Sequence, residues 1–315
     1  MVNKIVFFHM NQLGDLLFSI PVLKAAKQEL KTKIYSVVRQ DLSPLLISSN
    51  LTDKIVPKDK KLINNLRKET LSMAIFFSES PRSLITAYLL KIKERIGFET
   101  SSLNFLLTKK IRRIGVPSLF NNRELGIGMG LKTVHADYTN ILKIPLKNLN
   151  YVKQWFTKNR FNISKTIVIS IGASKKRQSK CLEKNKWIKV IDILSEKGFN
   201  CILTGAEWEK KILKKISVKC KIKPKLFHAK NGILDNAALL KISPLFVGID
   251  SGALHLAAAV GTKCVAIFCC TDPLQIGPMP LEKHVIIKKN NMSEITIEDI
   301  VSKVKNSWRI KKCHA

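Results

Sequence analysis

Long apolar runs, acidic residues and paired cysteines are scarce in this 315-residue sequence. No apolar run approaches the roughly 18–20 residues that a membrane span needs, which argues against a transmembrane protein. The amino end, MVNKIVFFHMNQLGD, has a polar break after a short apolar run and no small-residue cleavage site, so it predicts a strand rather than a signal peptide. The seven cysteines stand at no metal or disulfide spacing, which favours a reducing, cytoplasmic location.

The shortage of acidic residues makes the chain strongly basic, with 23 Asp and Glu against 55 Lys and Arg and a formal net charge of +32. Such an excess predicts a polyanionic partner, either nucleic acid or acidic lipid headgroups. Solvated faces and the bias of an AT-rich genome are the alternative for any single basic run. Aromatic residues are only 7% and sit in apolar runs rather than among the basic residues, so no nucleic acid is expected.

Apolar runs alternate with helical patterns along the whole chain, and its length and hydrophobic fraction of 45% allow about two domains with a core each. Strands that alternate with helices predict an α/β fold, with doubly wound parallel sheets covered by helices on both faces. A last helix is expected at 297–308. The predicted strands lie at 4–8, 33–38, 54–57, 71–77, 95–98, 166–171, 201–204, 225–228, 245–249, 265–268 and 284–288.

The most informative stretch follows the predicted strand at 245–249. Asp250, Ser251 and Gly252 are residue types that end a strand and begin a helix. Ligands of parallel sheets bind at the carboxyl ends of strands, and the unpaired N–H groups and dipole of a helix amino end favour an anion there. Ser251 and Gly252 are therefore expected to offer N–H groups to a phosphate, with Asp250 capping the helix.

His255 falls on the first turn of this helix, where it can reach a phosphate oxygen or a sugar hydroxyl. The alternative is an ordinary N-cap with a core histidine. Thr271 and Asp272 end the next strand and are expected at the same edge of the sheet, which favours a ligand site.

These residues carry a resemblance to a known family. The chain has D-S-G-A-L-H-L-A-A-A-V-G at 250–261 and C-C-T-D-P at 269–273. These stretches resemble the donor-binding signature of glycosyltransferase family 9, the bacterial heptosyltransferases. The family signature reads D-[TS]-G-x-x-H-L-x-A-A-x-G, followed by G-P-T-D-P. L-G-D-L at 13–16 and R-I-G-F at 95–98 are similar to its L-G-D-[VIL] and R-I-G-[YF]. The chain departs from the family at Cys269-Cys270, at Ser170-Ile171 in place of His-Pro, and at Leu182-Glu183 in place of Trp-Pro.

The resemblance implies the GT-B architecture, two Rossmann-like domains that face a cleft. Residues 1–149 would bind the acceptor, residues 150–315 would bind the donor, and the last helix would pack back on the first domain. The resemblance makes Asp15 the general base, whereas capping statistics alone favour an N-cap aspartate. Other candidates for the acceptor lie beside Asp15 or in basic clusters: Asn11, Gly14, Lys60, Lys61 and Arg113.

In the second half, the family has a strand, a glycine turn and a basic loop. In this chain the strand at 166–171 is followed by a turn with Gly172 and Ser174 and by a basic loop with Lys180. A cation here would stabilise the charge of a leaving diphosphate. Lys180 takes the family's lysine position, and Lys175, Lys176 and Arg177 are alternatives because the loop diverges. Glu207 and Glu209 could accept a ribose hydroxyl, or could merely favour the start of a helix through its dipole.

The expected activity is inverting transfer of a heptose from ADP-heptose to the anionic inner core of lipopolysaccharide, by an enzyme peripheral to the inner membrane. No D-x-D occurs in the chain, so no metal or other cofactor is expected. The alternatives are a transferase with another nucleotide sugar or acceptor, and a non-catalytic polyanion-binding protein of the same fold. The glycine-rich segment at 126–130 is expected to be flexible and is left unassigned, because it follows no apolar strand and opens no clear apolar helix. Residues 135–142 resemble a helix of the family.

Overall fold

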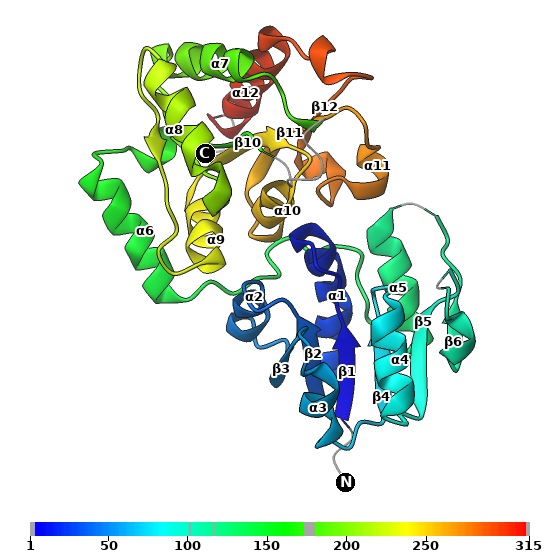
Figure 1. Cartoon of the computed structure of the whole chain (residues 1–315). Coiled ribbons are helices and arrows are strands. Elements are labelled where there is room, and N and C mark those ends of the chain that lie inside the picture. Colours follow the sequence, from blue (N-terminus) through cyan, green and yellow to red (C-terminus); the bar gives the residue numbers. More distant parts are fainter. Residues whose placement is uncertain (1–3, 101, 116, 173–179, 313–315) are drawn as a thin grey trace. The chain divides into compact units, whose positions relative to one another are not determined.

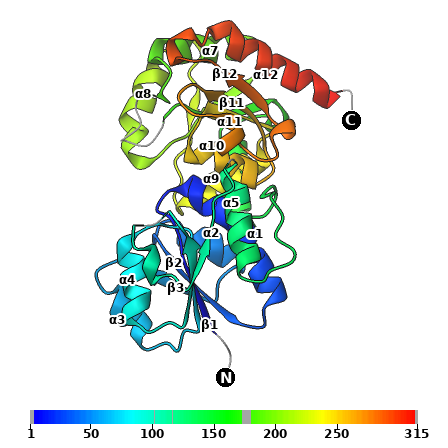
Figure 2. The same ribbon diagram turned by 90° about the vertical axis from the view of Figure 1, so that its right-hand side faces the viewer.

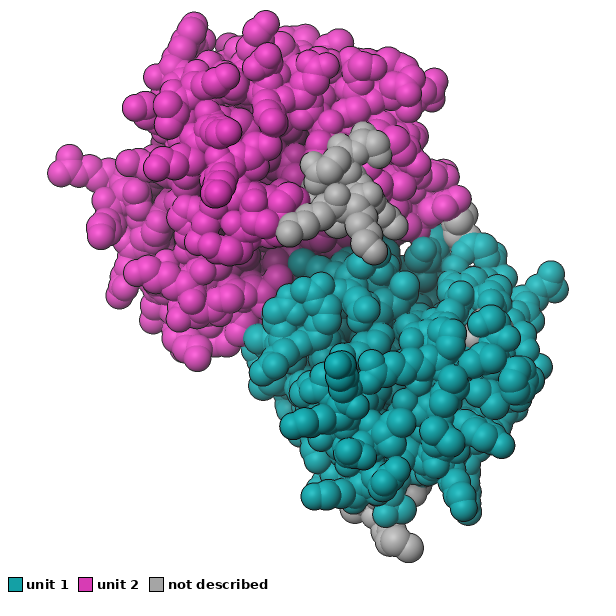
Figure 3. Space-filling view, viewed as in Figure 1, with its two compact units in different colours: residues 1–143 teal, residues 144–315 magenta. Residues whose placement is uncertain are grey.

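The computed structural model describes residues 4–100, 102–115, 117–172 and 180–312. The chain divides into two compact units, residues 1–143 and 144–315 (Figure 3). The division falls a few residues before the predicted boundary at 149, since helix α6 (Leu146–Lys158) belongs to the second unit. In that helix the Asn148 side-chain amide donates to the Asp235 carboxylate at 2.7 Å, within the same unit.

The first unit holds a parallel sheet in the order β3-β2-β1-β4-β5-β6 (Figure 1). Its strand sequences are buried apolar runs such as KIVFF in β1, as expected for strands covered on both faces. The strands are β1 (Lys4–Phe8), β2 (Lys33–Val38), β3 (Lys54–Pro57), β4 (Met73–Phe76), β5 (Glu94–Phe98) and β6 (Lys109–Ile111).

Helices α3 (Leu62–Arg67) and α4 (Pro81–Leu89) lie on one face of this sheet, and α1 (Leu13–Glu29) and α5 (Ser118–Gly128) lie on the other (Figure 2). The short helix α2 (Ser43–Ser48) joins β2 to β3, and a 3₁₀ turn, η1 (Asn104–Leu106), precedes β6. The chain turns from one half of the sheet to the other between β1 and β4, which makes their carboxyl ends a switch point where ligands bind in such sheets.

The second unit repeats the arrangement with the order β12-β11-β10-β7-β8-β9. Its switch point lies between β7 and β10, which pair in parallel. The strands are β7 (Thr166–Ser170), β8 (Asn200–Leu203), β9 (Lys225–Leu226), β10 (Leu245–Ile249), β11 (Lys263–Phe268) and β12 (Val285–Lys288). The remaining helices are α7 (Lys184–Glu196), α8 (Lys210–Lys219), α9 (Ile233–Ile242), α10 (Gly252–Ala259), α11 (Pro273–Ile276) and α12 (Ile297–Lys312).

The last helix, α12, contributes Ile300, Val301 and Val304 to the core of the second unit. It packs against α7, β11 and β12. Its predicted packing on the first domain stays a prediction. No helix in the described part of the chain combines the length and apolar character that crossing a membrane requires.

The strand and helix alternation, and with it the α/β doubly wound prediction, is confirmed. The segment at 126–130, which the sequence left unassigned, contains the end of α5, which continues to Gly128. A Cβ on Gly126 would approach Val134 to 2.8 Å, so a small residue is needed there for close packing. One local prediction is wrong. Residues 135–142 form no helix.

Candidate functional site

Asp250 lies at the carboxyl end of β10, and its carboxylate is the centre of a buried polar cluster. Lys180 Nζ donates to Asp250 Oδ2, and the Thr271 hydroxyl donates to the same oxygen at 2.7 Å. The Lys180 and Asp250 side chains are only 8% and 7% exposed. Three segments that are distant in sequence, following β7, β10 and β11, therefore converge at the switch point of the second sheet.

The predicted capping role of Asp250 is wrong. Ser251 occupies the N-cap position of α10 with an extended backbone, φ −155° and ψ 167°, and Asp250 uses its carboxylate for Lys180 and Thr271 instead. Within the described residues, the N–H groups of Gly252 and Ala253 make no backbone hydrogen bond, and the buried Ser251 Oγ has no partner. The amino end of α10 thus retains the donors that an anion would need.

His255 is buried beside this cluster, with Nε2 at 3.9 Å from Asp250 Oδ1. The pKa of His255 is lowered to about 4, chiefly by burial; the Asp250 carboxylate opposes the change and the Lys180 charge adds to it. The imidazole is therefore neutral near pH 7. It can hydrogen-bond a ligand but brings no positive charge, so Lys180 is the cation of the cluster.

Glu209 and Glu207, which the sequence left as equal candidates, differ in the structure. Glu209 is 6% exposed, and its Oε2 accepts the Ala206 N–H at 2.7 Å. Burial raises the pKa of Glu209, although the Ala206 hydrogen bond works in the opposite direction. Glu207 points to solvent, with 80% of its side chain exposed and a salt bridge to Lys210 at 2.5 Å.

Two glycines make room for the Glu209 carboxylate. A Cβ on Gly172, after β7, would overlap the carboxylate, and a Cβ on Gly205, after β8, would lie 2.7 Å from Oε2. Glu209 therefore occupies the space between the carboxyl ends of two adjacent strands. Ser174 and the alternative cations Lys175, Lys176 and Arg177 lie outside the described residues.

Thr271 and Asp272 also have different roles. Thr271 turns inward to Asp250, whereas Asp272 is exposed and caps α11 by accepting the Leu274 N–H at 2.9 Å. Lys288 holds the strand end nearby, since its Nζ donates to the carbonyls of Cys269 and, at 3.0 Å, of Thr271. Asp272 thus has a local structural function, and the cluster around Asp250 does not include it.

In the first unit, Asp15 is the third residue of α1, in the loop-to-helix transition that follows β1. Asn11 and Gly14 flank it, and the Asn11 carbonyl accepts from Arg39 Nη1 at 3.1 Å. This places Asp15 at the carboxyl edge of the first sheet, beside its switch point, as predicted from the sequence. Gln12, and not Asp15, is the N-cap residue of α1.

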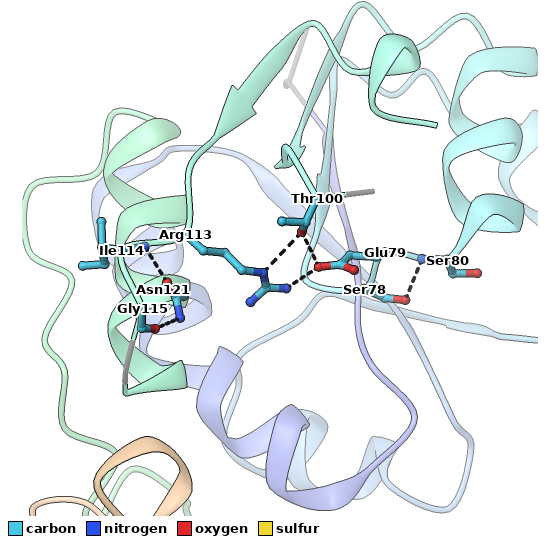
Figure 4. A network of polar contacts seen from close by, with 8 residues as sticks. All are labelled: Ser78, Glu79, Ser80, Thr100, Arg113, Ile114, Gly115 and Asn121. Carbon is cyan, nitrogen blue, oxygen red and sulfur yellow. Dashed lines mark hydrogen bonds and ion pairs between the residues drawn. The ribbon is translucent and has the colours of Figure 1, made fainter. Parts of the chain in front are cut away.

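The basic candidates in this unit fall into two groups. Lys60 and Lys61 are exposed, and Lys61 is the N-cap residue of α3. Arg113 is directed toward Glu79 and Thr100 (Figure 4), with Nη2 at 2.6 Å from Glu79 Oε1 and its guanidinium 4.0 Å from the Phe98 ring centroid. The charge of Arg113 is therefore balanced within the unit, whereas no carboxylate in the described residues pairs with Lys60 or Lys61.

Two further residues lie at this edge: His9, which the sequence analysis did not single out, and Lys58, which belongs to the same basic cluster as Lys60 and Lys61. His9, directly after β1, is fully buried and hydrogen-bonded to Ser19 Oγ at 2.9 Å and Ser36 Oγ at 3.3 Å; burial and the Lys58 charge lower its pKa to about 3. Lys58, directly after β3, donates to the His9 carbonyl at 3.2 Å, and burial and the Arg82 charge lower its pKa. A polar residue immediately after a predicted strand was the signal that could have identified both.

Two parallel Rossmann-like sheets, each with polar residues at the carboxyl edge of its switch point, define the GT-B fold. Residues 60–305 match the family model described as Glycosyltransferase family 9 (heptosyltransferase), and the chain belongs to this family.

Relatives and solved structures agree with this membership. Lipopolysaccharide heptosyltransferase 3 of Escherichia coli K12 is 23% identical over 332 aligned residues, which cover 92% of this chain and 93% of that protein. The crystal structure of a family 9 glycosyltransferase from Veillonella parvula matches with a TM-score of 0.87 at 14% identity, over 98% of this chain and 97% of that one. E. coli ADP-heptose lps heptosyltransferase II matches with a TM-score of 0.82 at 16% identity, over 98% and 99% of the two chains.

Proposed function

We propose that this glycosyltransferase transfers a heptose from ADP-heptose to the inner core of lipopolysaccharide, with inversion at the anomeric carbon and without a metal ion. The observation that carries the proposal is the buried Lys180, Asp250 and Thr271 cluster beside the amino end of α10. The heptose donor and the lipopolysaccharide acceptor follow the printed names of the relatives and of the matched heptosyltransferase II.

The donor diphosphate would bind at the amino end of α10. Lys180 has three N–H donors, of which Asp250 takes one among the described residues, and the others would serve phosphate oxygens. The N–H groups of Gly252 and Ala253 and the Ser251 hydroxyl complete an anion site that needs little rearrangement. As the sugar bond breaks, these donors would stabilise the charge that develops on the leaving ADP.

His255 and Glu209 would hydrogen-bond the donor without adding positive charge to the site. A neutral imidazole at the first turn of α10 suits a hydroxyl or a phosphate oxygen. In the described part of the chain the Glu209 carboxylate accepts from the Ala206 N–H at Oε2, and its Oε1 would accept a hydrogen bond from a ribose hydroxyl. Burial of this carboxylate makes such a hydrogen bond stronger than it would be in water.

Asp15 would act as the general base on the acceptor. It would remove the proton of the acceptor hydroxyl as that oxygen attacks the anomeric carbon on the face opposite the diphosphate, which inverts the configuration. The exposed, uncompensated lysines Lys60 and Lys61 would bind the phosphorylated acceptor. The excess of basic residues would hold the protein on the anionic inner leaflet of the inner membrane, from the cytoplasmic side.

The test is acceptor-dependent ADP release from ADP-heptose with a truncated inner-core acceptor, in the presence of EDTA. We expect Asp15→Asn to lower kcat by about 10²–10⁴-fold, as for the loss of a general base. Asp41→Asn, at an exposed surface pair with Arg39 in the same unit, is the matched control and should retain full activity. Activity of Asp15→Asn equal to wild type would refute the base assignment, and loss of activity in EDTA would refute the metal-free mechanism.

Two other functions remain testable alternatives. A transferase for another nucleotide sugar is suggested by the divergence at Ser170-Ile171 and Leu182-Glu183, and it predicts ADP or another nucleotide released from a different donor. A non-catalytic polyanion-binding protein predicts acceptor binding without turnover from any donor. The buried lysine and carboxylate at the donor edge favour the transferases, because a surface that only binds polyanions has no use for a desolvated Lys180–Asp250 pair.

A further inference from the structure

Helix α4 has an apolar surface that faces solvent. Ile85, Tyr88 and Leu89 are 42%, 54% and 59% exposed, and their spacing of three and four residues places them on one side of the helix. The opposite side contributes Leu84 and Ala87 to the core under the sheet. A surface helix that packs on one side normally presents polar residues on the other, so the outer side of α4 departs from the expected pattern.

A fourth exposed apolar side chain extends this surface. Phe105 of η1 is 70% exposed, and η1 packs against α4. Arg95 links the two elements, with its guanidinium 5.8 Å from the Tyr88 ring centroid and its Nε donating to the Leu106 carbonyl at 2.6 Å. We call the surface formed by Ile85, Tyr88, Leu89 and Phe105 the α4–η1 face.

The segment that carries the α4–η1 face is rich in basic residues. Between residues 80 and 113 the sequence holds eight Lys and Arg residues but only the two acidic residues Glu94 and Glu99. The basic residues with exposed side chains are Arg82, Lys91, Lys93, Lys109, Lys110 and Arg112. The same part of the chain therefore exposes aliphatic and aromatic side chains and an excess of positive charge.

We propose that the α4–η1 face docks the protein on an anionic lipid bilayer. Tyr, Phe, Leu and Ile enter the boundary between headgroups and acyl chains favourably, and each Lys or Arg near an anionic surface adds about 1 kcal/mol of attraction. A second copy of the chain would bring two strongly basic segments together, which disfavours self-association. The proposal rests on the proposed function for its biological setting, since an enzyme that acts on a lipid-linked acceptor must reach the membrane.

The position of α4 is compatible with that setting. The helix begins at Pro81, shortly after β4 ends at Phe76, so its amino end starts from the ligand-binding edge of the first sheet. Figures 1 and 2 show α4 lying along one face of this sheet, on the side opposite α1 and α5. A bilayer along this face would meet the first unit on its flank and leave the edge that carries Asp15 uncovered.

The test is flotation of the full chain with vesicles of phosphatidylcholine, with and without phosphatidylglycerol. Wild type should bind only the vesicles that contain phosphatidylglycerol, and less at high salt. The triple variant Tyr88→Ser, Leu89→Ser and Phe105→Ser should bind these vesicles at least about tenfold more weakly, because it loses most of the buried apolar area. Thermal unfolding checks that the variant is folded, as expected for substitutions of exposed side chains.

The matched control is Val218→Ser with Ile222→Ser, in and just after α8, where the side chains are 60% and 49% exposed and are also surrounded by lysines. This control should bind vesicles like wild type. Loss of binding in the control but not in the triple variant would overturn the proposal, as would absence of wild-type binding. Self-association abolished by the triple variant would assign the face to a second copy instead.

Transfer to a deacylated, soluble acceptor separates this proposal from the proposed function. The triple variant should retain that activity in full while it loses vesicle binding. An inactive wild type that still binds vesicles through the α4–η1 face would refute the proposed function alone. An active wild type whose vesicle binding ignores the three substitutions would refute the docking face alone.

Discussion

Lys180 and Asp250, which are 70 positions apart in the sequence, form an ion pair that is almost completely buried at the carboxyl edge of the second sheet. The Thr271 hydroxyl satisfies the same carboxylate oxygen at 2.7 Å. A buried charge without its partner is strongly unfavourable, so each side chain depends on the other. Removal of one partner should therefore affect stability as well as donor binding.

The first prediction concerns the ion pair itself. Lys180→Met leaves the Asp250 carboxylate buried without its countercharge and should lower the free energy of unfolding by about 3–5 kcal/mol, as observed when one partner of a buried pair is removed. The double variant Lys180→Met with Asp250→Leu should recover most of this loss in free energy of unfolding, measured by urea unfolding. Neither the single nor the double variant should bind ADP. Additive losses in the double-mutant cycle would contradict the coupling.

The second prediction concerns Glu209 and Glu207. Glu209→Gln keeps the shape that fits between Gly172 and Gly205 but removes the charge of the acceptor oxygen, so ADP should bind about tenfold more weakly with little change in stability. Glu207→Gln, at a side chain that is 80% exposed, is the control and should leave ADP affinity unchanged. Isothermal titration calorimetry measures both. Equal affinities for the two variants would remove Glu209 from the donor site.

The third prediction separates Thr271 from Asp272. Thr271→Val removes a hydroxyl that orients Asp250 and should weaken donor binding. The ion pair between Asp250 and Lys180 is kept in this variant. Asp272→Ala removes the α11 cap and should cost about 0.5–2 kcal/mol of stability without an effect on KM for the donor. Steady-state kinetics and thermal unfolding of the two variants distinguish the roles. The reverse assignment, with Asp272 controlling KM, would restore the sequence-based expectation for that residue.

The fourth prediction is a pH dependence of stability caused by His9. Burial and the Lys58 charge lower its pKa to about 3 in the folded state, against about 6.5 when unfolded. The unfolded chain therefore binds more protons in this range, so the contribution of His9 is fully present above pH 6.5 and is lost as the pH falls toward 3, by about 1.4 kcal/mol per pH unit.

His9→Gln keeps hydrogen-bonding capacity toward Ser19 and Ser36 but cannot be protonated. Urea unfolding between pH 4 and pH 8 should show a smaller decrease of stability toward acid in this variant than in wild type. His255, whose pKa is also lowered, remains in both proteins and cancels in the comparison. An identical acid dependence would mean that His9 does not titrate on unfolding as described.

The sequence predicted the second-unit site best where the motif is local. The strand at 245–249, the helix that follows Ser251 and the turn at Thr271 are adjacent in the chain, and local pattern defines them well. The role of Asp250 was predicted wrongly as a helix cap, because the competing partner Lys180 approaches from another strand end. Capping statistics describe local alternatives and cannot include a tertiary partner.

Other roles were left open by the sequence for the same reason. Glu207 and Glu209 are equivalent as acidic residues in a helix first turn, and only the packing of Glu209 over Gly172 and Gly205 distinguishes them. Arg113 was predicted to bind an acceptor among other basic residues, and the fold instead pairs it with Glu79. The acceptor role of Arg113 stays a prediction, and its charge is balanced by Glu79.

By itself, the sequence determined the alternation of strands and helices, the strongly basic surface and the local turns at Asp15 and Asp250, because apolar periodicity and turn chemistry act between neighbouring residues. Only the tertiary structure decided which polar side chains are desolvated together and which remain in water. Parallel strands bring segments such as those of Lys180 and Asp250 to one edge, and burial there sets their partners, their pKa values and thereby their chemistry.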